Sequence, residues 1–331
     1  MVYDRVPVEP PFAGIPTFLK LPYITSPEAL KAEQPDVVIL GAPFDMGTTN
    51  RPGARYGPRA IRAASNLGRT IHHLATGVQP LRHLRVFDYG DAVVVPSSIE
   101  RSHEAIREKV REVAQLGAIP FVLGGDHSIT LPSVTAIADV LGQGNVGVIH
   151  FDAHADTAPD EWGNLLGHGT PMRRLIEQGS VAGRNFVQVG LRGYWPPPDV
   201  VEWMHEQGMR WHLMAEIEDR GFDIVLEDAL TEALDGPDAI YISVDVDVLD
   251  PAFAPGTGTP EPGGLTSREL LGAIRRIVGA VRLVGLDIVE VSPAYDGPGA
   301  ITAEVAHRVA LEALSMLALK RVSGEDRTIK S

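Results

Sequence analysis

Three short segments of the sequence carry carboxylate and imidazole side chains at spacings that suit metal binding. In the first, Asp152, His154 and Asp156 alternate with alanines after an apolar run at 146–149. Alternate residues of an extended chain point to the same side. Ionised groups that converge beside a core strand are costly unless they are paired or bind a cation. The segment therefore indicates a metal site, and a hydrogen-bonded polar cluster is the alternative.

Two further segments also place polar side chains directly after apolar runs. Asp245 and Asp247 share one face of the chain, and the alternative for this pair is a turn that caps a strand. His127 lies in the segment 124–128, where two glycines allow a tight turn before the next helix. A structural histidine is the alternative there, and Asp126 is assigned either to the turn or to the support of a ligand. Each of these segments is a weaker signal alone than the first.

Together the three segments supply two imidazoles and four carboxylates from three expected strand ends. Oxygen and imidazole ligands suit Mn²⁺ and also accept Ni²⁺, Co²⁺ or Zn²⁺. One divalent ion would leave two negative charges buried, whereas two ions neutralise four carboxylates. A pair of ions can lower the pKa of a bound water to about 7 and hold it for attack. We therefore expect a binuclear site formed by His127, Asp152, His154, Asp156, Asp245 and Asp247.

Two residues outside these segments are candidates for the remaining chemistry. His168, downstream of the first segment, could shuttle a proton to a leaving amine. Glu290, at the end of an apolar run, has a carboxylate that suits a planar cation with several donors, such as guanidinium. The alternatives are a surface histidine at a helix start and a glutamate paired with an arginine.

The elements that must position these residues alternate between short apolar strands and amphipathic helices, which predicts an α/β fold on a parallel sheet with both faces covered. Continuous apolar strands fit burial on both faces. The expected strands are 36–41, 85–89, 119–123, 146–151, 186–191, 210–213, 240–246 and 284–289. The expected helices are 99–115, 128–141, 267–278 and 303–319.

The 331 residues form one domain in this interpretation, with 1–31 as an N-terminal extension and 251–264 as a long functional loop. A net charge of −14 disfavours nucleic acid and anionic membranes as partners. The sequence has no cysteine, which excludes disulfides and thiolate chemistry. It shows no signal-peptide pattern and no long apolar run. We expect a cytoplasmic protein.

The motifs resemble those of the ureohydrolase family, which comprises arginases, agmatinases, guanidinobutyrases and proclavaminate amidinohydrolases. The likeness runs from about Ile15 to Leu319 and keeps its motifs in order. The matching pieces are Arg-Pro-Gly-Ala-Arg-Tyr-Gly-Pro at 51–58, Gly-Gly-Asp-His-Ser at 124–128, Asp-Ala-His-Ala-Asp-Thr at 152–157, Ser-Val-Asp-Val-Asp-Val-Leu-Asp-Pro at 243–251, Ala-Pro-Gly-Thr-Gly-Thr-Pro-Glu-Pro-Gly-Gly at 254–264 and Glu-Val-Ser-Pro-Ala-Tyr-Asp at 290–296.

The resemblance implies a role for each candidate residue. His127 and Asp156 would bind one manganese ion, His154 and Asp247 would bind the other, and Asp152 and Asp245 would bridge both. His168 would be the proton shuttle and Glu290 the guanidinium ligand. From the ligand set itself we expect Asp156 or a neighbouring carboxylate to steady the hydroxide and relay a proton. The family fold is a three-layer α/β/α sandwich on an eight-stranded, mostly parallel sheet, and its members usually form trimers or hexamers.

The favoured activity is cleavage of a small guanidino substrate to urea and an amine, with agmatine as the leading substrate. The segment 168–174 is more similar to agmatinases and guanidinobutyrases than to arginases. Guanidinobutyrate, guanidinopropionate and guanidine itself are the alternatives, the last with nickel. Asp160 or Glu161 could attract the amine of agmatine, and Trp162 and Trp195 could narrow the pocket. Packing or surface roles remain open for these four.

Two other classes of function remain as alternatives. Metal-dependent deacetylases have a similar architecture and a related Asp/His cluster but use a single zinc ion, whereas His127 and Asp247 complete a second site here. A catalytically silent partner subunit commonly lacks a ligand, and every expected ligand is present. Acetate release would identify the first alternative, and a site without metal would identify the second.

Overall fold

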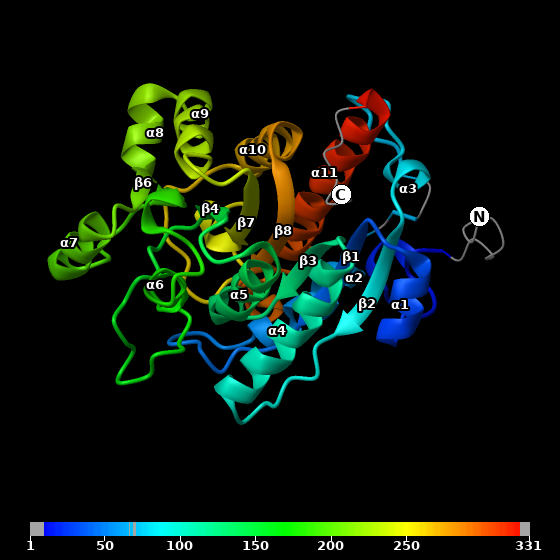
Figure 1. Ribbon diagram of the computed structural model, residues 1–331, viewed down its shortest axis with the longest axis horizontal. Helices are drawn as coiled ribbons and strands as arrows, with labels where there is room; N and C mark the ends of the chain where they lie inside the picture. The colour runs from blue at the N-terminus through cyan, green and yellow to red at the C-terminus, as the bar shows by residue number, and fades with distance from the viewer. Residues whose placement is uncertain (1–9, 66, 69–70, 325–331) are drawn as a thin grey trace.

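A single parallel sheet of eight strands organises the molecule (Figure 1). The computed structural model describes residues 10–65, 67–68 and 71–324. The strand order is β2-β1-β3-β8-β7-β4-β5-β6, which in Figure 1 runs from right to left. The strands are β1 (Val37–Ala42), β2 (Val86–Asp91), β3 (Ile119–Gly124), β4 (Val146–Phe151), β5 (Phe186–Leu191), β6 (Arg210–Leu213), β7 (Ala239–Asp245) and β8 (Arg282–Val289).

Helices cover the two faces of this sheet and bury two separate hydrophobic cores. Neighbouring residues of one strand belong to different cores, as Ile39 and Leu40 do. One core contains side chains of α2 (Gly57–Ala63), α9 (Phe222–Ala233), α10 (Ser267–Ala280) and α11 (Ile301–Ser323). The other contains side chains of α4 (Ile99–Gln115), α5 (Thr130–Leu141), α6 (Pro171–Glu177) and α7 (Pro198–Glu206). The predicted three-layer α/β/α fold is therefore confirmed.

The strands agree closely with those predicted from apolar runs. The observed bounds of β4, β5 and β6 are those expected, and β8 begins two residues earlier, at Arg282. The predicted helix 99–115 is α4, and the predicted 303–319 lies inside α11. The predicted 128–141 is interrupted, because His127–Ile129 form a 3₁₀ turn before α5 begins. This turn places His127 at the end of β3.

The remaining helices were not predicted, because most are short. Five of the seven begin with a proline at the first or second position, where its fixed φ suits a helix start. Few residues then remain to display helical periodicity. Besides α2, α6, α7 and α9, these helices are α1 (Pro27–Glu33), α3 (Pro80–His83) and α8 (Met214–Arg220).

The predicted N-terminal extension packs into the same chain from residue 18 onward. Phe18 lies in the core beside α11, and Leu30 of α1 lies in the opposite core. The first nine residues of the predicted extension lie outside the described residues. The predicted loop 251–264 contains no helix or strand. Within the described part of the chain, no helix is both long and apolar enough to cross a membrane.

His307 of α11 gives the fold a measurable pH dependence. Its ring stacks on Phe18 with centroids 4.3 Å apart, and neither ring nitrogen has a hydrogen-bond partner among the described residues. Burial, together with the nearby Arg308 charge, lowers the pKa of His307 to about 3. The folded state thus keeps His307 neutral, whereas the unfolded chain takes up a proton below its ordinary pKa of about 6.5.

We predict that His307→Phe makes stability less sensitive to acid. Because the folded pKa is depressed, the wild-type chain loses stability as the pH falls from about 6.5 toward 3. Between pH 7.5 and 5.5 this loss is about 1.4 kcal/mol from one histidine. Urea unfolding gives the free energy of unfolding at each pH. The drop in this free energy between pH 7.5 and 5.5 should be smaller by that amount in His307→Phe. An unchanged difference would contradict the assignment, and exposed His72→Phe is the control.

Candidate metal centre

The candidate residues gather at the carboxyl ends of four adjacent strands at the middle of the sheet. The order β3-β8-β7-β4 makes these four neighbours although they are far apart in the sequence. Pairing of Phe151 with Val244 and of Asp245 with Val289 brings the strand ends level. The carboxyl ends of parallel strands are where ligands bind in such sheets. After them come His127 (β3), Asp152, His154 and Asp156 (β4), Asp245 and Asp247 (β7) and Glu290 (β8).

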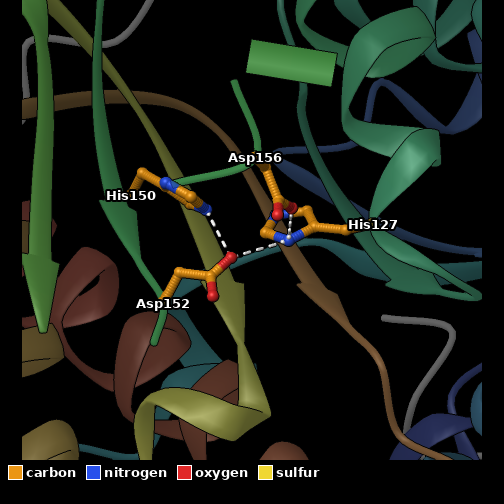
Figure 2. A group of neighbouring side chains, drawn as sticks. All are labelled: His127, His150, Asp152 and Asp156. Carbon is orange, nitrogen blue, oxygen red and sulfur yellow. Dashed lines mark hydrogen bonds and ion pairs between the residues drawn. The ribbon is translucent and has the colours of Figure 1, made fainter. Parts of the chain in front are cut away.

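One half of the cluster surrounds the ring of His127. Its Nδ1 lies 3.0 Å from an oxygen of Asp152, 2.9 Å from Asp156 and 3.2 Å from Asp245. Figure 2 shows the ring facing Asp152 and Asp156. No hydrogen bond of good geometry satisfies this nitrogen among the described residues. Three carboxylate oxygens around one buried imidazole nitrogen form a binding site for a cation.

The other half of the cluster surrounds His154. Its Nδ1 lies 3.1 Å from Asp247 Oδ2 and 3.4 Å from Asp152 Oδ1. Asp152 therefore contacts His127 through Oδ2 and His154 through Oδ1. This is the arrangement expected of a carboxylate shared between two ions. Both groups are spaced closely enough to hold a metal ion.

Hydrogen bonds from the backbone hold the carboxylates in place. The amide of His154 donates to Asp152 at 2.6 Å, and the amide of Asp247 donates to Asp245 at 2.8 Å. Ala153 donates to Asp247 at 3.2 Å. These amide groups lie in the turns that follow β4 and β7, so the turns themselves orient the ligands. Partial positive charge from amides does not by itself neutralise four buried carboxylates.

Without a cation, several groups of the cluster have shifted pKa values. Burial, with Asp247 and Asp152 nearby, raises the pKa of Asp245 well above its usual value. Burial lowers the pKa of His127, but the close carboxylates of Asp152, Asp156 and Asp245 outweigh it and raise the pKa. Protons therefore occupy positions that divalent ions would take. A donor set of imidazoles and carboxylates fits two such ions.

The ring of His127 is held with its Nδ1 directed at the carboxylates, in the position from which it could bind a metal ion. Asp287 of β8 accepts hydrogen bonds from Ser243, Thr130 and Tyr241. Since the Ser243 hydroxyl donates to Asp287 at 2.7 Å, its oxygen accepts from His127 Nε2 at 2.9 Å. The Nε2 position then carries a proton, and Nδ1 is the nitrogen that would offer its lone pair to a metal ion in place of its own proton.

His168 and Glu290 lie together beside the cluster. His168 Nδ1 is 2.9 Å from Glu290 Oε1, and its Nε2 is 2.8 Å from the Thr49 hydroxyl. Burial lowers the pKa of His168, but Glu290, Asp156 and Asp126 outweigh it and raise the pKa to about 10. The Thr49 amide faces Nε2 at 3.2 Å and opposes a proton there. We assign the firmly held proton to Nδ1 and the exchangeable one to Nε2.

One oxygen of Glu290 is left for a ligand. Oε1 accepts from the His127 amide and from His168, whereas the buried Oε2 has no hydrogen-bond partner among the described residues. Gly258 approaches this oxygen, and a Cβ at that position would lie 3.5 Å from it. A buried carboxylate oxygen without a donor is costly. A ligand with N–H groups would satisfy it.

The segment from Asp152 to Asp156 is not extended, contrary to the prediction from the sequence pattern, although its side chains do converge. β4 ends at Phe151, and Asp156 has a φ of +52°. Glu290 has a φ of +62°. Non-glycine residues rarely adopt this left-handed region, and such strained conformations cluster at active sites and ligand-binding sites. The side chains converge because the chain turns after the strand and not because an extended chain alternates.

An open cavity of about 680 Å³ leads to the cluster. Asp156, Asp245 and His154 line its inner part, with His168 and Thr49 beside them. The residues singled out for specificity line it as well: Asp160, Glu161, Trp162 and Trp195. Trp162 is 89% exposed and Trp195 71% exposed, so neither is a core packing residue. Further lining comes from Asn50, Arg51, Thr259 and Glu261.

Sequence reasoning missed several polar residues around the cluster. His150 and Gln188 are fully buried in β4 and β5, and Asp287 is fully buried in β8. Their signal in the sequence is a polar residue inside an otherwise apolar strand. Thr49, which contacts His168, lies in a loop that carries no comparable signal. Asp126, assigned to a turn, accepts from Ser128 and from the Gly47 amide.

Comparisons with known proteins agree with this architecture. The model of the Arginase family matches residues 35–316. Guanidinopropionase from Pseudomonas aeruginosa is 44% identical over 93% of each chain, and mitochondrial agmatinase from Gallus gallus is 41% identical over 86% of this chain and 81% of its own. The chain therefore belongs to the arginase family. The prediction of a ureohydrolase is confirmed at the level of the family.

Solved structures are similar over nearly the whole chain. Proclavaminate amidino hydrolase from Streptomyces clavuligerus superposes with a TM-score of 0.84 at 37% identity, covering 94% of this chain and 99% of that one. Formiminoglutamase from Trypanosoma cruzi, solved with Mn²⁺, has a TM-score of 0.78 at 29% identity and covers 86% and 94%. The His/Asp cluster lies in a fold that holds manganese in that relative.

We predict that Asp247→Asn removes metal from the cluster. Its Oδ2 is a neighbour of His154, and an amide offers neither the negative charge nor the second acceptor oxygen. Metal analysis after Mn²⁺ loading should give about two ions per chain for the wild type and fewer for the variant, with turnover reduced in parallel. Exposed Asp219→Asn is the control. Two retained ions with full turnover in Asp247→Asn would contradict a binuclear site.

Proposed function

We propose that the protein hydrolyses a small guanidino compound to urea and an amine. The observation that carries this proposal is the unpartnered Glu290 Oε2, which is buried beside His168 and next to a cluster of four carboxylates and two imidazoles. A guanidinium group supplies planar N–H donors and a positive charge to such an oxygen. Membership of the arginase family supports the same reaction class.

The proposed cofactor is a pair of divalent ions, with manganese favoured and nickel as the alternative. His127, Asp156 and Asp152 would hold one ion, and His154, Asp247 and Asp152 the other, with Asp245 reaching the first group in this structure. When bound, such a pair lowers the pKa of water and supplies a nucleophile at neutral pH. The manganese in the T. cruzi relative supports this assignment.

The chain's own residues have separate tasks in this proposal. Glu290 binds the guanidinium and fixes its orientation. His168 holds one proton on Nδ1 through Glu290 and exchanges the other on Nε2, where Thr49 and the cavity lie. That nitrogen can protonate the departing amine. Asp156, at the inner wall of the cavity, is proposed to steady the attacking group and relay its proton.

The charges of the cavity favour a cationic tail and therefore agmatine. Outside the cluster, three carboxylates line the cavity, from Asp160, Glu161 and Glu261. Arg51 is the one lysine or arginine among the lining residues. Asp160 is exposed and the other two are half-buried, and their negative charge attracts a primary amine at the far end of a linear guanidine. Agmatine is accordingly the first proposed substrate.

A second candidate substrate class is a guanidino acid, and Arg51 is the observation that favours it. Its guanidinium lies over the Tyr295 ring, 5.4 Å from the ring centroid, which leaves its edge free to bind a carboxylate. No carboxylate pairs with it among the described residues. Relatives named guanidinopropionase, guanidinobutyrase and guanidino acid hydrolase support this class. Guanidine has no tail, so it would need neither the cavity carboxylates nor Arg51.

We predict urea release from one member of a panel after loading with Mn²⁺ or Ni²⁺. The panel is agmatine, 4-guanidinobutyrate, 3-guanidinopropionate, arginine, guanidine and acetylputrescine. Arg51→Met should raise KM for a guanidino acid by about tenfold or more, the value of one charge-assisted pair, and should leave agmatine unaffected or improved. Exposed Arg59→Met is the control.

Other outcomes of the panel would point to a different function for the protein. Acetate from acetylputrescine in place of urea would replace the proposal with a deacetylase. No product from a fully metal-loaded protein would indicate an unusual guanidine or amidine substrate or a different hydrolysis, whereas a site that stays without metal would fit a silent subunit. The proposal also includes a cytoplasmic location and assembly as a trimer or hexamer, and sedimentation analysis would measure the latter.

We predict that Glu290→Gln abolishes most of the activity and keeps the metal. The side-chain shape is retained, but the guanidinium loses its ionic partner, at a cost of about 3 kcal/mol or roughly a hundredfold in kcat/KM. Since Glu290 is not a proposed metal ligand, metal content should equal that of the wild type. A kcat/KM within a few-fold of the wild type would exclude Glu290 as the guanidinium ligand. Exposed Glu218→Gln is the control.

A further inference from the structure

The fully buried His150 lies beside the cluster and has no role in the proposed reaction. Its Nε2 is 2.9 Å from Asp152 Oδ2, the oxygen that also faces His127 (Figure 2). Its position is near enough for a metal ligand, because His150 falls in the same group as His127, Asp152 and Asp156. Two roles therefore compete. A metal ligand needs a lone pair on Nε2, whereas a hydrogen-bond donor to Asp152 needs a proton there.

The hydrogen bonds on the far side of the ring decide between these roles. Gln188 Nε2 lies 2.7 Å from the Ala155 carbonyl oxygen, which can only accept, so this end of the side-chain amide is the NH₂ group. The same Nε2 lies 2.9 Å from His150 Nδ1. An NH₂ group has two hydrogens and can donate to both neighbours. His150 Nδ1 therefore accepts, and in the neutral ring the proton is on Nε2.

We propose that His150 is a positioning residue that donates a hydrogen bond to Asp152 and is not a metal ligand. The chain of contacts from the Ala155 carbonyl through Gln188 and His150 to Asp152 fixes one lone pair of Oδ2. Asp152 is the carboxylate that contacts both halves of the cluster, so its orientation sets both. The inference rests on the proposed metal cluster and adds His150 and Gln188 as residues that orient one of its ligands.

Burial gives this chain of contacts its strength. His150, Asp152 and Gln188 each have no solvent-exposed surface, so water cannot replace a lost contact. His150 also packs against Phe186 with ring centroids 5.8 Å apart. A phenylalanine at position 150 would keep the ring and remove only the donor. A glutamine would keep an N–H close to the position of Nε2.

The test is the affinity for Mn²⁺, measured by calorimetry on the metal-free full chain. We expect His150→Phe to weaken binding by about 10- to 100-fold, as for other residues that orient ligands. His150→Gln should stay within a few-fold of the wild type. Gln188→Met, which leaves His150 and Asp152 in place, should weaken binding in the same direction. Thermal unfolding of each metal-free variant checks that the fold is retained.

Direct observation of the tautomer provides a second readout. In the metal-free chain labelled with ¹⁵N-histidine, we expect His150 to have a protonated Nε2 and an unprotonated Nδ1, with the resonances assigned by their loss in His150→Gln. Gln188→Met should release this preference. If His150→Phe fails to fold, Gln188→Met and the ¹⁵N spectrum decide the question.

Three results would overturn the inference. Unchanged affinity in both His150→Phe and Gln188→Met would exclude positioning. A proton on Nδ1 in the spectrum would contradict the assigned tautomer. Equal loss of metal in His150→Gln and His150→Phe would make His150 a ligand. Failure of the wild-type chain to bind any divalent ion would instead reject the metal cluster of the proposed function, so the two failures are distinguishable.

Discussion

Mutual repulsion of four buried aspartates is the constraint on which the rest of the structure depends. Asp152, Asp156, Asp245 and Asp247 converge within a few ångströms of two imidazoles and are largely shielded from water. Repulsion between carboxylates at these distances opposes folding unless protons or cations intervene. Elements elsewhere in the chain supply the rigidity that keeps the four together. The two cores on either face of the sheet fix the strands, and the strands fix the carboxylates.

The parallel sheet is a suitable support because all its strands end at one edge. Turns after β4 and β7 present backbone amides to the carboxylates, and the strand order brings β3, β8, β7 and β4 side by side. Behind the ligands, Ser243 accepts a hydrogen bond from the His127 ring and donates one to Asp287, and Gln188 donates to the ring of His150. The site is thus a layered arrangement in which His127, Asp152, Asp245 and Asp247 are each held by a further hydrogen bond. Arg192 adds to it by donating to the backbone carbonyl of Asp247 at 2.7 Å.

Much of this arrangement could be predicted from the sequence, because strands buried on both faces leave an unmistakable apolar pattern and polar motifs follow them directly. The order of the strands could not be predicted, because no local feature of β8 shows that it pairs with β3 on one side and β7 on the other. His150 and Asp287 were missed for a related reason. A lone polar residue inside an apolar strand gives no hint of its partner, and its partners lie on strands distant in sequence. The turn at Asp156 replaced an extended chain because tertiary packing, not local preference, sets its φ.

The left-handed conformations of Asp156 and Glu290 have a consequence for how this protein would respond to selection. A side chain in that region costs roughly 1 kcal/mol or more, which glycine avoids. Glycine at either position would also remove a buried carboxylate from a crowded, negatively charged environment. A library screened only for heat resistance would therefore enrich glycine at these two positions and yield robust proteins that no longer turn over substrate. Stability favours glycine at these two positions, whereas activity requires the carboxylates. A screen for stability must therefore include an activity assay.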